Sequence, residues 1–278
     1  GLDCGGVSVE GPYGNGSYTC VRGQSCVLAP VEGQGIRSSD YVQVHKGRCD
    51  DVLNGGRPPA KVHLSTSHSS GNGFTAAFGH VLDEMGPGLL AVCWCRGSPQ
   101  CSSPAGFRSF VGTLELHGPR GGHDVKCFIG QPCIMTTIEG FNLQVGDRLM
   151  VLYDCGSNSV PDGLPGDGIA EALNSPSNFT FQTSWDDAKV LSGAPGIFRL
   201  CFCRSHDGGV SINNSCASGH NFVADIGIFS AQGPLINQTR VCEIGKACEV
   251  MGVQGIGLED GGRVLVGGRV PPHASCSW

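Results

Sequence analysis

The stretch "CVRGQSC" at residues 20–26 returns as "CFIGQPC" at 127–133 and as "CEIGKAC" at 242–248. Every copy has the pattern C-x-x-G-x-x-C and begins eight residues after the proline of a Gly-Pro pair, at Pro12, Pro119 and Pro234. Seven residues after the second cysteine of each copy comes a glycine, at Gly33, Gly140 and Gly255. Three copies with the same flanks indicate an internal repeat.

The spacing of the copies matches the size of a small domain. They start 107 and then 115 residues apart, which is far longer than the unit of a solenoid. We therefore predict tandem globular modules. The predicted parts are an N-terminal strand at 1–12, a first module at 13–119, a second at 120–234 and an incomplete third at 235–278.

Short apolar or alternating segments within the modules predict β-strands, because glycine, proline, asparagine and aspartate separate them. These segments are "DYVQVH" (40–45), "AKVHLS" (60–65), "VGTLEL" (111–116), "DRLMVLY" (147–153), "NFTFQTSW" (178–185) and "GIFRLCFC" (196–203). Only "GIAEALN" at 168–174 suggests a helical turn. The pattern favours an all-β fold of tandem antiparallel β-sandwich modules, immunoglobulin-like in size and strand number.

The chain has 16 cysteines, six of them in each full module, and six cysteines allow fifteen pairings. We favour disulfides between adjacent strands and across tight turns, since these place the Cα atoms at suitable distances. The expected pairs are Cys20–Cys26, Cys49–Cys93, Cys95–Cys101, Cys127–Cys133, Cys155–Cys201, Cys203–Cys216 and Cys242–Cys248. In the "CWC" and "CFC" strands we expect the aromatic side to be buried and the cysteines to lie on the outer face or at an edge.

Composition and sequence motifs indicate a secretory protein. The net charge is -6 and the basic residues do not cluster, which argues against nucleic acid or an anionic membrane as a partner. No apolar run approaches the roughly 18 residues that span a bilayer, and the absence of a signal peptide suggests a processed or excised piece. Dense cysteine favours an oxidising compartment. Four sequons predict N-glycans, at Asn15, Asn178, Asn213 and Asn237.

Other chemistries fit the sequence less well. The cysteine spacings differ from those of structural zinc sites, and there is no C-x-x-C redox pair. We interpret one polar stretch as a strand end and loop rather than part of a catalytic triad; it contains His63, Ser67, His68 and Ser69. Asp162 and Asp167 in "PDGLPGDG" lack the alternating oxygen ligands of a calcium loop. We predict no enzyme, no cofactor and no metal site.

The third module looks unfinished. It has 37 residues from Cys242 to the last residue, whereas the first module has 82 residues from Cys20 to Cys101. Conversely, "CGGVSVEGP" at 4–12 matches the exit strand "VGTLELHGP" at 111–119. We expect copies of the chain to join head to tail, with this strand of one copy completing the third module of the next, and Cys4 and Cys276 available to bridge them. The other reading is a fragment of a longer repeat protein.

Repeats that close on a "CWC" strand resemble those of long secreted proteins of single-celled eukaryotes, including flagellar-hair components. The resemblance covers the repeat motifs and implies a structural role at the cell surface and no enzymatic activity. The alternative is a cell-surface adhesin whose module loops, especially 50–73 and 156–177, bind a glycan or a protein receptor.

Overall fold

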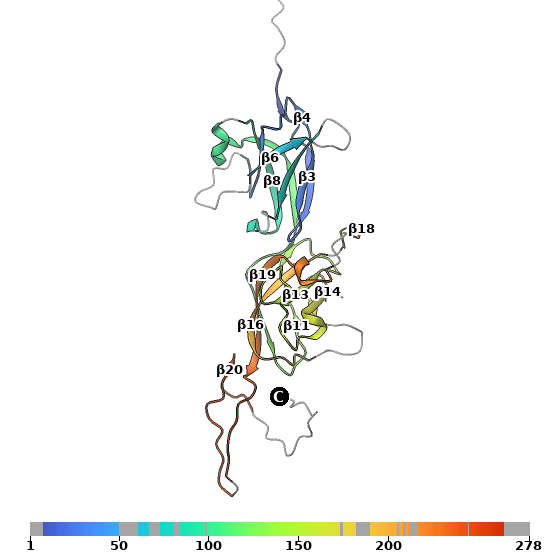
Figure 1. Ribbon diagram of the computed structural model, residues 1–278. Helices are drawn as coiled ribbons and strands as arrows, with labels where there is room; N and C mark the ends of the chain where they lie inside the picture. The colour runs from blue at the N-terminus through green and yellow to red at the C-terminus, as the bar shows by residue number, and fades with distance from the viewer. Residues whose placement is uncertain are drawn as a thin grey trace, which may run out of the picture. The chain divides into compact units, whose positions relative to one another are not determined.

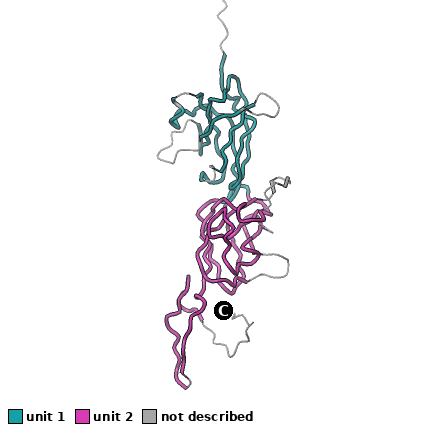
Figure 2. Tube along the Cα trace, viewed as in Figure 1, with its two compact units in different colours: residues 1–119, 140–142 teal, residues 120–139, 143–278 magenta. Residues whose placement is uncertain are grey.

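The computed structural model describes residues 8–49, 61–66, 73–80, 84–97, 99–172, 175–181, 190–204, 206–207, 210–211, 216–243 and 245–263. In these ranges the chain is all-β, and its helical segments are short 3-10 turns (Figure 1). None of the helices in this part of the protein is long and apolar enough to cross a membrane. The chain divides into two compact units (Figure 2): Gly1–Pro119 with Gly140–Asn142, and Arg120–Glu139 with Leu143–Trp278.

One continuous sheet forms most of the first unit. Its strands follow the order β2–β9–β8–β5–β6–β7–β3, with β12 (Gly140–Phe141) paired to the end of β9. The bounds are β2 Gly16–Val21, β3 Cys26–Val31, β5 Tyr41–His45, β6 Lys61–Thr66, β7 Phe74–Gly79, β8 Gly88–Cys95 and β9 Ser109–Pro119. Because β2 and β3, at the two ends of this path, are consecutive in the chain and joined by the Cys20–Cys26 disulfide, the sheet is barrel-like.

Strand β6 connects the two halves of this sheet, because it pairs with a different strand along each half of its length. Its first half, at Lys61–His63, pairs with β5, and its second half, at Leu64–Thr66, pairs with β7. The apolar side chains that face inward, among them Leu28, Val42 and Leu114, are almost fully buried in one core cluster. Burial of this kind is the main favourable term in folding, so the alternating pattern of the sequence decides which face of each strand points inward.

The second unit has the same strand order, β10–β19–β16–β13–β14–β15–β11, and the end of β19 also pairs with β20 (Gly255–Ile256). The bounds are β10 His123–Phe128, β11 Ile134–Met135, β13 Arg148–Leu152, β14 Ile169–Ala172, β15 Phe179–Thr180, β16 Gly196–Cys203 and β19 Ala224–Pro234. A two-residue hairpin, β17 (His206–Asp207) with β18 (Val210–Ser211), lies between β16 and β19 in the chain. The 3-10 turns are η2 Pro99–Ser102, η3 Pro104–Gly106, η4 Pro165–Gly168 and η5 Gly219–Asn221.

Two details of the predicted fold are wrong. The sheets are not antiparallel throughout, because β2 pairs in parallel with β9 and β10 pairs in parallel with β19. Residues 169–172 of the segment 168–174 do not form a helical turn: η4 ends at Gly168, and Ile169–Ala172 is a strand whose alternate residues, Ala170 and Ala172, are buried, while residues 173–174 lie outside the described part of the chain. Alanine and glutamate are good helix formers, but pairing with β13 and burial of the two alanines outweigh this local preference.

The cysteine face of β8 and β16 also differs from expectation. The aromatic side is buried as predicted, but the cysteines on the other side are buried too: Cys93 and Cys201 are both 0% exposed. In the first unit they pack with Cys49, Cys101 and Phe107, and in the second with Cys216 and Phe222. The disulfides hold the loop after each strand over this face, so it forms a second, smaller core instead of an outer surface.

Candidate functional site: the glycine-proline joint

Each Gly-Pro pair of the sequence forms a short antiparallel ladder with the glycine that follows the next cysteine motif. We call this ladder the Gly-Pro joint. Its three copies are β1 (Gly11–Pro12) with β4 (Gly33–Gln34), Gly118–Pro119 with Gly140–Phe141, and Gly233–Pro234 with Gly255–Ile256. In every copy the proline lies opposite the glycine, so the register is the same three times.

A backbone hydrogen bond extends each joint by one residue. The amide after the proline donates to the carbonyl before the glycine: Tyr13 to Glu32 at 3.1 Å, Arg120 to Glu139 at 2.7 Å, and Leu235 to Gln254 at 2.8 Å. Proline has no amide hydrogen to donate, so this following amide supplies the donor that the ladder needs. The joint is thus made mainly by main-chain atoms.

The glycine opposite the proline is required for close approach of the two backbones. A Cβ atom built on Gly33 would overlap the carbonyl oxygen of Gly11, and one built on Gly255 would overlap that of Gly233. This contact is the physical reason for the fixed glycine in the repeat, because no other residue leaves room for the partner's carbonyl group.

The residue two positions after that glycine has a left-handed conformation in all three copies. It is Gly35 (φ 68°), Asn142 (φ 52°) and Gly257 (φ 63°), and glycine and asparagine are the residues that adopt this conformation most readily. In the middle copy, Asn142 Nδ2 lies 3.1 Å from Nε2 of the buried His117, and the same His117 nitrogen lies 3.0 Å from Glu115 Oε2. Side chains of the exit strand therefore reinforce the joint.

The first copy of the joint has its own side-chain contacts. Glu10, just before Gly11, forms an ion pair with Arg96, and Gln34 Nε2 donates to Ser8 Oγ at 3.4 Å. These contacts hold residues 8–12 against the first unit. They leave the side chain of Val9 80% exposed.

Val9 occupies a position that is buried in the other exit strands. Counting back from the proline of the Gly-Pro pair, its counterparts are Leu116 in β9 and Ala231 in β19, each 1% exposed. Those residues contribute to the cores of their units. Val9 is thus an exposed valine, among the described residues, at a position where the other two exit strands are buried.

The third copy of the cysteine motif shows the complementary feature. The cysteines of the first two copies are 2–7% exposed, whereas Cys242 and Cys248 are exposed. Val250 is 37% exposed, although its counterparts Leu28 and Met135 are buried. Within the described residues after Pro234, β20 pairs with the end of β19, and the apolar positions of the motif remain open to solvent.

The third copy nevertheless keeps a contact found in the first. Tyr18, two residues before Cys20, donates its hydroxyl to the carbonyl of Pro30 at 3.0 Å. Arg240, two residues before Cys242, donates to the carbonyl of Gly252 at 2.6 Å, and Gly252 is the counterpart of Pro30. The two arms that flank the third cysteine motif are therefore tied together as in the first unit.

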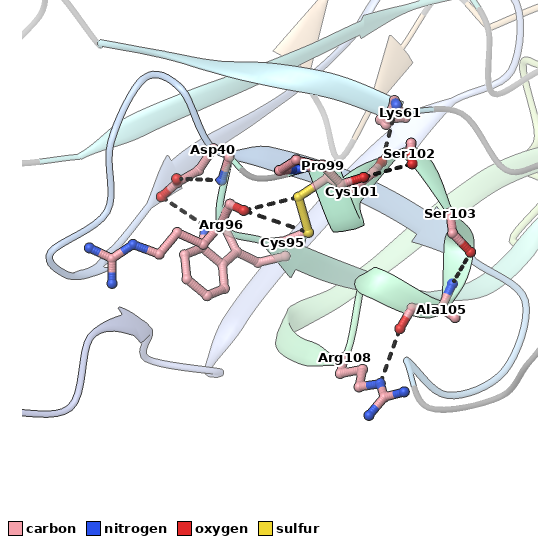
Figure 3. The surroundings of a disulfide bond; sticks show 12 residues. Asp40, Lys61, Cys95, Arg96, Pro99, Cys101, Ser102, Ser103, Ala105 and Arg108 are labelled. Atoms are coloured by element: carbon pink, nitrogen blue, oxygen red, sulfur yellow. Dashed lines mark hydrogen bonds between the residues drawn. A yellow bond between two sulfur atoms is a disulfide. The ribbon is translucent and has the colours of Figure 1, made fainter.

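Among the described residues there are seven disulfides, with the partners that the spacing predicted. Their Cα atoms lie 5.4–5.8 Å apart. Figure 3 shows Cys95–Cys101, which closes the loop between β8 and β9. From strand β6, Lys61 Nζ donates to the carbonyl of Cys101 at 3.1 Å. Cys4 and Cys276 lie outside the described residues.

A buried aspartate that the sequence analysis missed precedes the central strand of each unit. Asp40 and Asp147 both lie 14 residues after the second cysteine of the motif, and this equal spacing was the available signal. Asp40 accepts hydrogen bonds from Arg37 N, Gly97 N and the indole of Trp94, the last at 3.2 Å. In the second unit Phe202 replaces the tryptophan, and Arg204 instead makes two hydrogen bonds to Asp147 at 2.7 and 2.8 Å.

The remaining predicted residues do not assemble into a chemical site in the described part of the chain. His63 stacks against Tyr41 with ring centroids 3.8 Å apart, while Ser67, His68 and Ser69 lie outside the described residues. No group of three or more histidines, cysteines, aspartates or glutamates that could hold a metal occurs in the ranges given above, which include Asp162 and Asp167.

The predicted modification and binding positions fall mostly on the surface. Asn15, Asn178 and Asn237 are exposed, and Asn213 lies outside the described residues, as does most of the loop 50–73. The loop 156–177 contains η4 and β14. A cavity of about 190 Å³ in the first unit is lined by Asn15, Tyr18 and Glu32 among others, which is below the roughly 300–1,000 Å³ of typical ligand pockets.

No protein-family model matches the chain, and no curated protein shows significant sequence similarity to it.

Proposed function

We propose that the protein is an extracellular structural protein whose β-modules follow one another through Gly-Pro joints and whose copies assemble head to tail. In this assembly the strand that ends in Gly11–Pro12 serves as the last strand of the third module of a neighbouring copy. The observation that carries the proposal is the repeated register of the joint: Gly11–Pro12 pairs with Gly33–Gln34 just as the ends of β9 and β19 pair with their own partners.

The exposure of Val9 and of the third cysteine motif supports this assembly. Burying a valine side chain contributes about 1.5–3 kcal/mol, and Val9 stands at a position where the other exit strands are buried. A contact between one end of a chain and the other end of the next is heterologous. Such contacts propagate as filaments unless a ring closes.

The order of the strands supports an immunoglobulin-like architecture for the modules. With β2 to β9 of the first unit named A to G, leaving out β4, the path reads A–G–F–C–D–E–B. Its two halves are the C–F–G and B–E–D groups of that fold. Strand A differs, since it pairs with G in parallel, and D joins the two halves by pairing on both sides.

An extracellular location is supported by the disulfides and the exposed sequons. Seven disulfides are typical of proteins that fold in an oxidising compartment. Asn15, Asn178 and Asn237 are accessible for N-glycosylation, which occurs in the same pathway.

The test is to measure assembly of the secreted protein. Light scattering after size-exclusion chromatography and negative-stain microscopy should show concentration-dependent oligomers with a linear arrangement. Val9→Asp should abolish them, because a carboxylate would have to enter an apolar core. Val27→Asp is the matched control, since Val27 is 52% exposed on β3 and should leave assembly unchanged. A wild-type protein that stays monomeric at high concentration would refute the proposal.

A further inference from the structure

The segment Gln238–Glu243, which ends within the start of the third cysteine motif, corresponds to the first strand of each unit. Its first residue lies four positions before Cys242, just as Gly16 lies four before Cys20 and His123 four before Cys127. In the two units this strand, β2 or β10, pairs in parallel with the exit strand. Among the described residues Gln238–Glu243 has no such partner strand.

The exit strands share a glycine at the point where the parallel pairing begins. Gly112 lies opposite Gly16, and Gly227 lies opposite His123. A Cβ atom on either glycine would overlap the backbone of the opposite strand. Each of these glycines comes seven residues before the proline of the joint, and so does Gly5 before Pro12. In sequence, the segment before Pro12 therefore carries a glycine at the position where the two exit strands need one for this close parallel approach.

We infer that residues 8–10 of one copy add beside Gln238–Glu243 of another copy as a parallel strand, with Ser8 opposite Val241 and Val9 opposite Cys242. The register follows from the pairs Cys20 with Leu116 and Cys127 with Ala231. The inference rests on the proposed assembly and specifies the two surfaces, their orientation and their alignment. In both units the exit strand pairs in parallel with the first strand, so Gln238–Glu243 is the neighbour that the repeat assigns to residues 8–10.

The acceptor segment is already positioned for this pairing. The bond from Arg240 to Gly252 ties it to the segment that follows the cysteine motif, and Gln238 Nε2 donates to the carbonyls of Leu235 and Gln254 at 2.7 and 2.8 Å. Val241 is 90% exposed. Its counterparts, Thr19 and Lys126, are exposed positions opposite Glu115 and Ser230, so Val241 should lie beside Ser8 on the outer side of the new strand pair.

Engineered cysteines test this register. In a background with Cys4→Ser and Cys276→Ser, the pair Ser8→Cys with Val241→Cys places two thiols directly opposite each other, within the Cα range that a disulfide allows. The control pair, Ser8→Cys with Thr239→Cys, is shifted by two residues along the strand, which separates the Cα atoms by about 8 Å. After mild oxidation we expect a ladder of covalent oligomers on a non-reducing gel from the first pair only, with the linked peptides identified by mass spectrometry.

The outcomes separate this inference from the proposed function. Oligomers in solution that form no Ser8→Cys/Val241→Cys crosslink, or that crosslink equally through Thr239→Cys, would overturn the register and leave head-to-tail assembly standing. A crosslink within a single chain would overturn the assignment to a second copy. A protein that neither associates nor crosslinks would overturn both.

Discussion

The buried aspartate just before β5 and β13 accepts hydrogen bonds from a different kind of side chain in each unit. Asp40 receives an indole hydrogen from Trp94, and Asp147 receives two hydrogen bonds from Arg204. A buried carboxylate without partners is costly, so the loss of the tryptophan in the second unit is offset by the arginine two residues later.

We predict that Arg204→Ala lowers the free energy of unfolding of the second unit by about 3–5 kcal/mol, because it leaves Asp147 buried and uncompensated. Arg199→Ala is the control. Arg199 lies in the same strand and pairs with Asp225, but both side chains are 41% exposed, and loss of an exposed pair should cost no more than about 1 kcal/mol. Denaturant titration of both variants measures the difference; equal losses would contradict the importance of the buried pair.

The close contact in the Gly-Pro joint gives a second prediction. Gly33→Ala should destabilise the first unit by about 1–3 kcal/mol, since the added methyl group must push the backbone at Gly11 away. Gly121→Ala should change stability by no more than about 0.5 kcal/mol, because nothing lies within 4 Å of that site. Calorimetry that finds the same small effect for both substitutions would show that the joint tolerates a side chain.

Tyr18 makes the first unit sensitive to alkaline pH. Burial, with a smaller contribution from the Glu32 carboxylate, raises the pKa of its hydroxyl above the ordinary value of 10.0. The protonated form is thus favoured in the folded state, and its stabilisation is complete below pH 10 and is lost as the pH rises through the raised pKa. We expect Tyr18→Phe to weaken this alkaline loss in unfolding experiments, whereas Phe at the 64% exposed Tyr13 should leave it unchanged.

At the scale of elements, the disulfides differ in the length of chain that they close. Cys49–Cys93 closes 44 residues, whereas Cys20–Cys26 closes six. The chain-entropy model gives about 4 kcal/mol for the longer loop and about 2 kcal/mol for the shorter. Replacing the first pair with alanines should therefore destabilise the first unit more than replacing the second, as measured by urea unfolding. The reverse order would show that native packing around the sulfurs outweighs loop closure.

The sequence predicted some of these elements well for identifiable reasons. Six cysteines allow fifteen pairings, and the expected pairs were chosen because cysteines across a tight turn or on adjacent strands lie at suitable Cα distances. The strand at Ile169–Ala172 was missed, since its short apolar pattern also fits a helical turn. The parallel pairing of β2 with β9 joins residues about 100 positions apart and depends on Gly112, whose role no local pattern reveals. The repeat shows the fixed glycines of the joint in the sequence, but it does not show that they pair with the Gly-Pro residues.

At the scale of the whole molecule, glycosylation offers a direct check on the secretory pathway. We expect N-glycans at the exposed Asn15, Asn178 and Asn237 when the chain is produced in a eukaryotic secretory host. Enzymatic deglycosylation in heavy-oxygen water followed by peptide mapping would mark each occupied asparagine. Unmodified asparagines at all three sites in a host that glycosylates control proteins would contradict this prediction.

The main-chain character of the Gly-Pro joint has a consequence for how such a chain can be lengthened. The ladder depends on backbone groups and a few small residues. An additional module inserted by gene duplication could therefore form the same joint without substitutions elsewhere in the chain. The exposed residues of the modules could then change during evolution, while the lengthened chain kept the same Gly-Pro ladder at every junction.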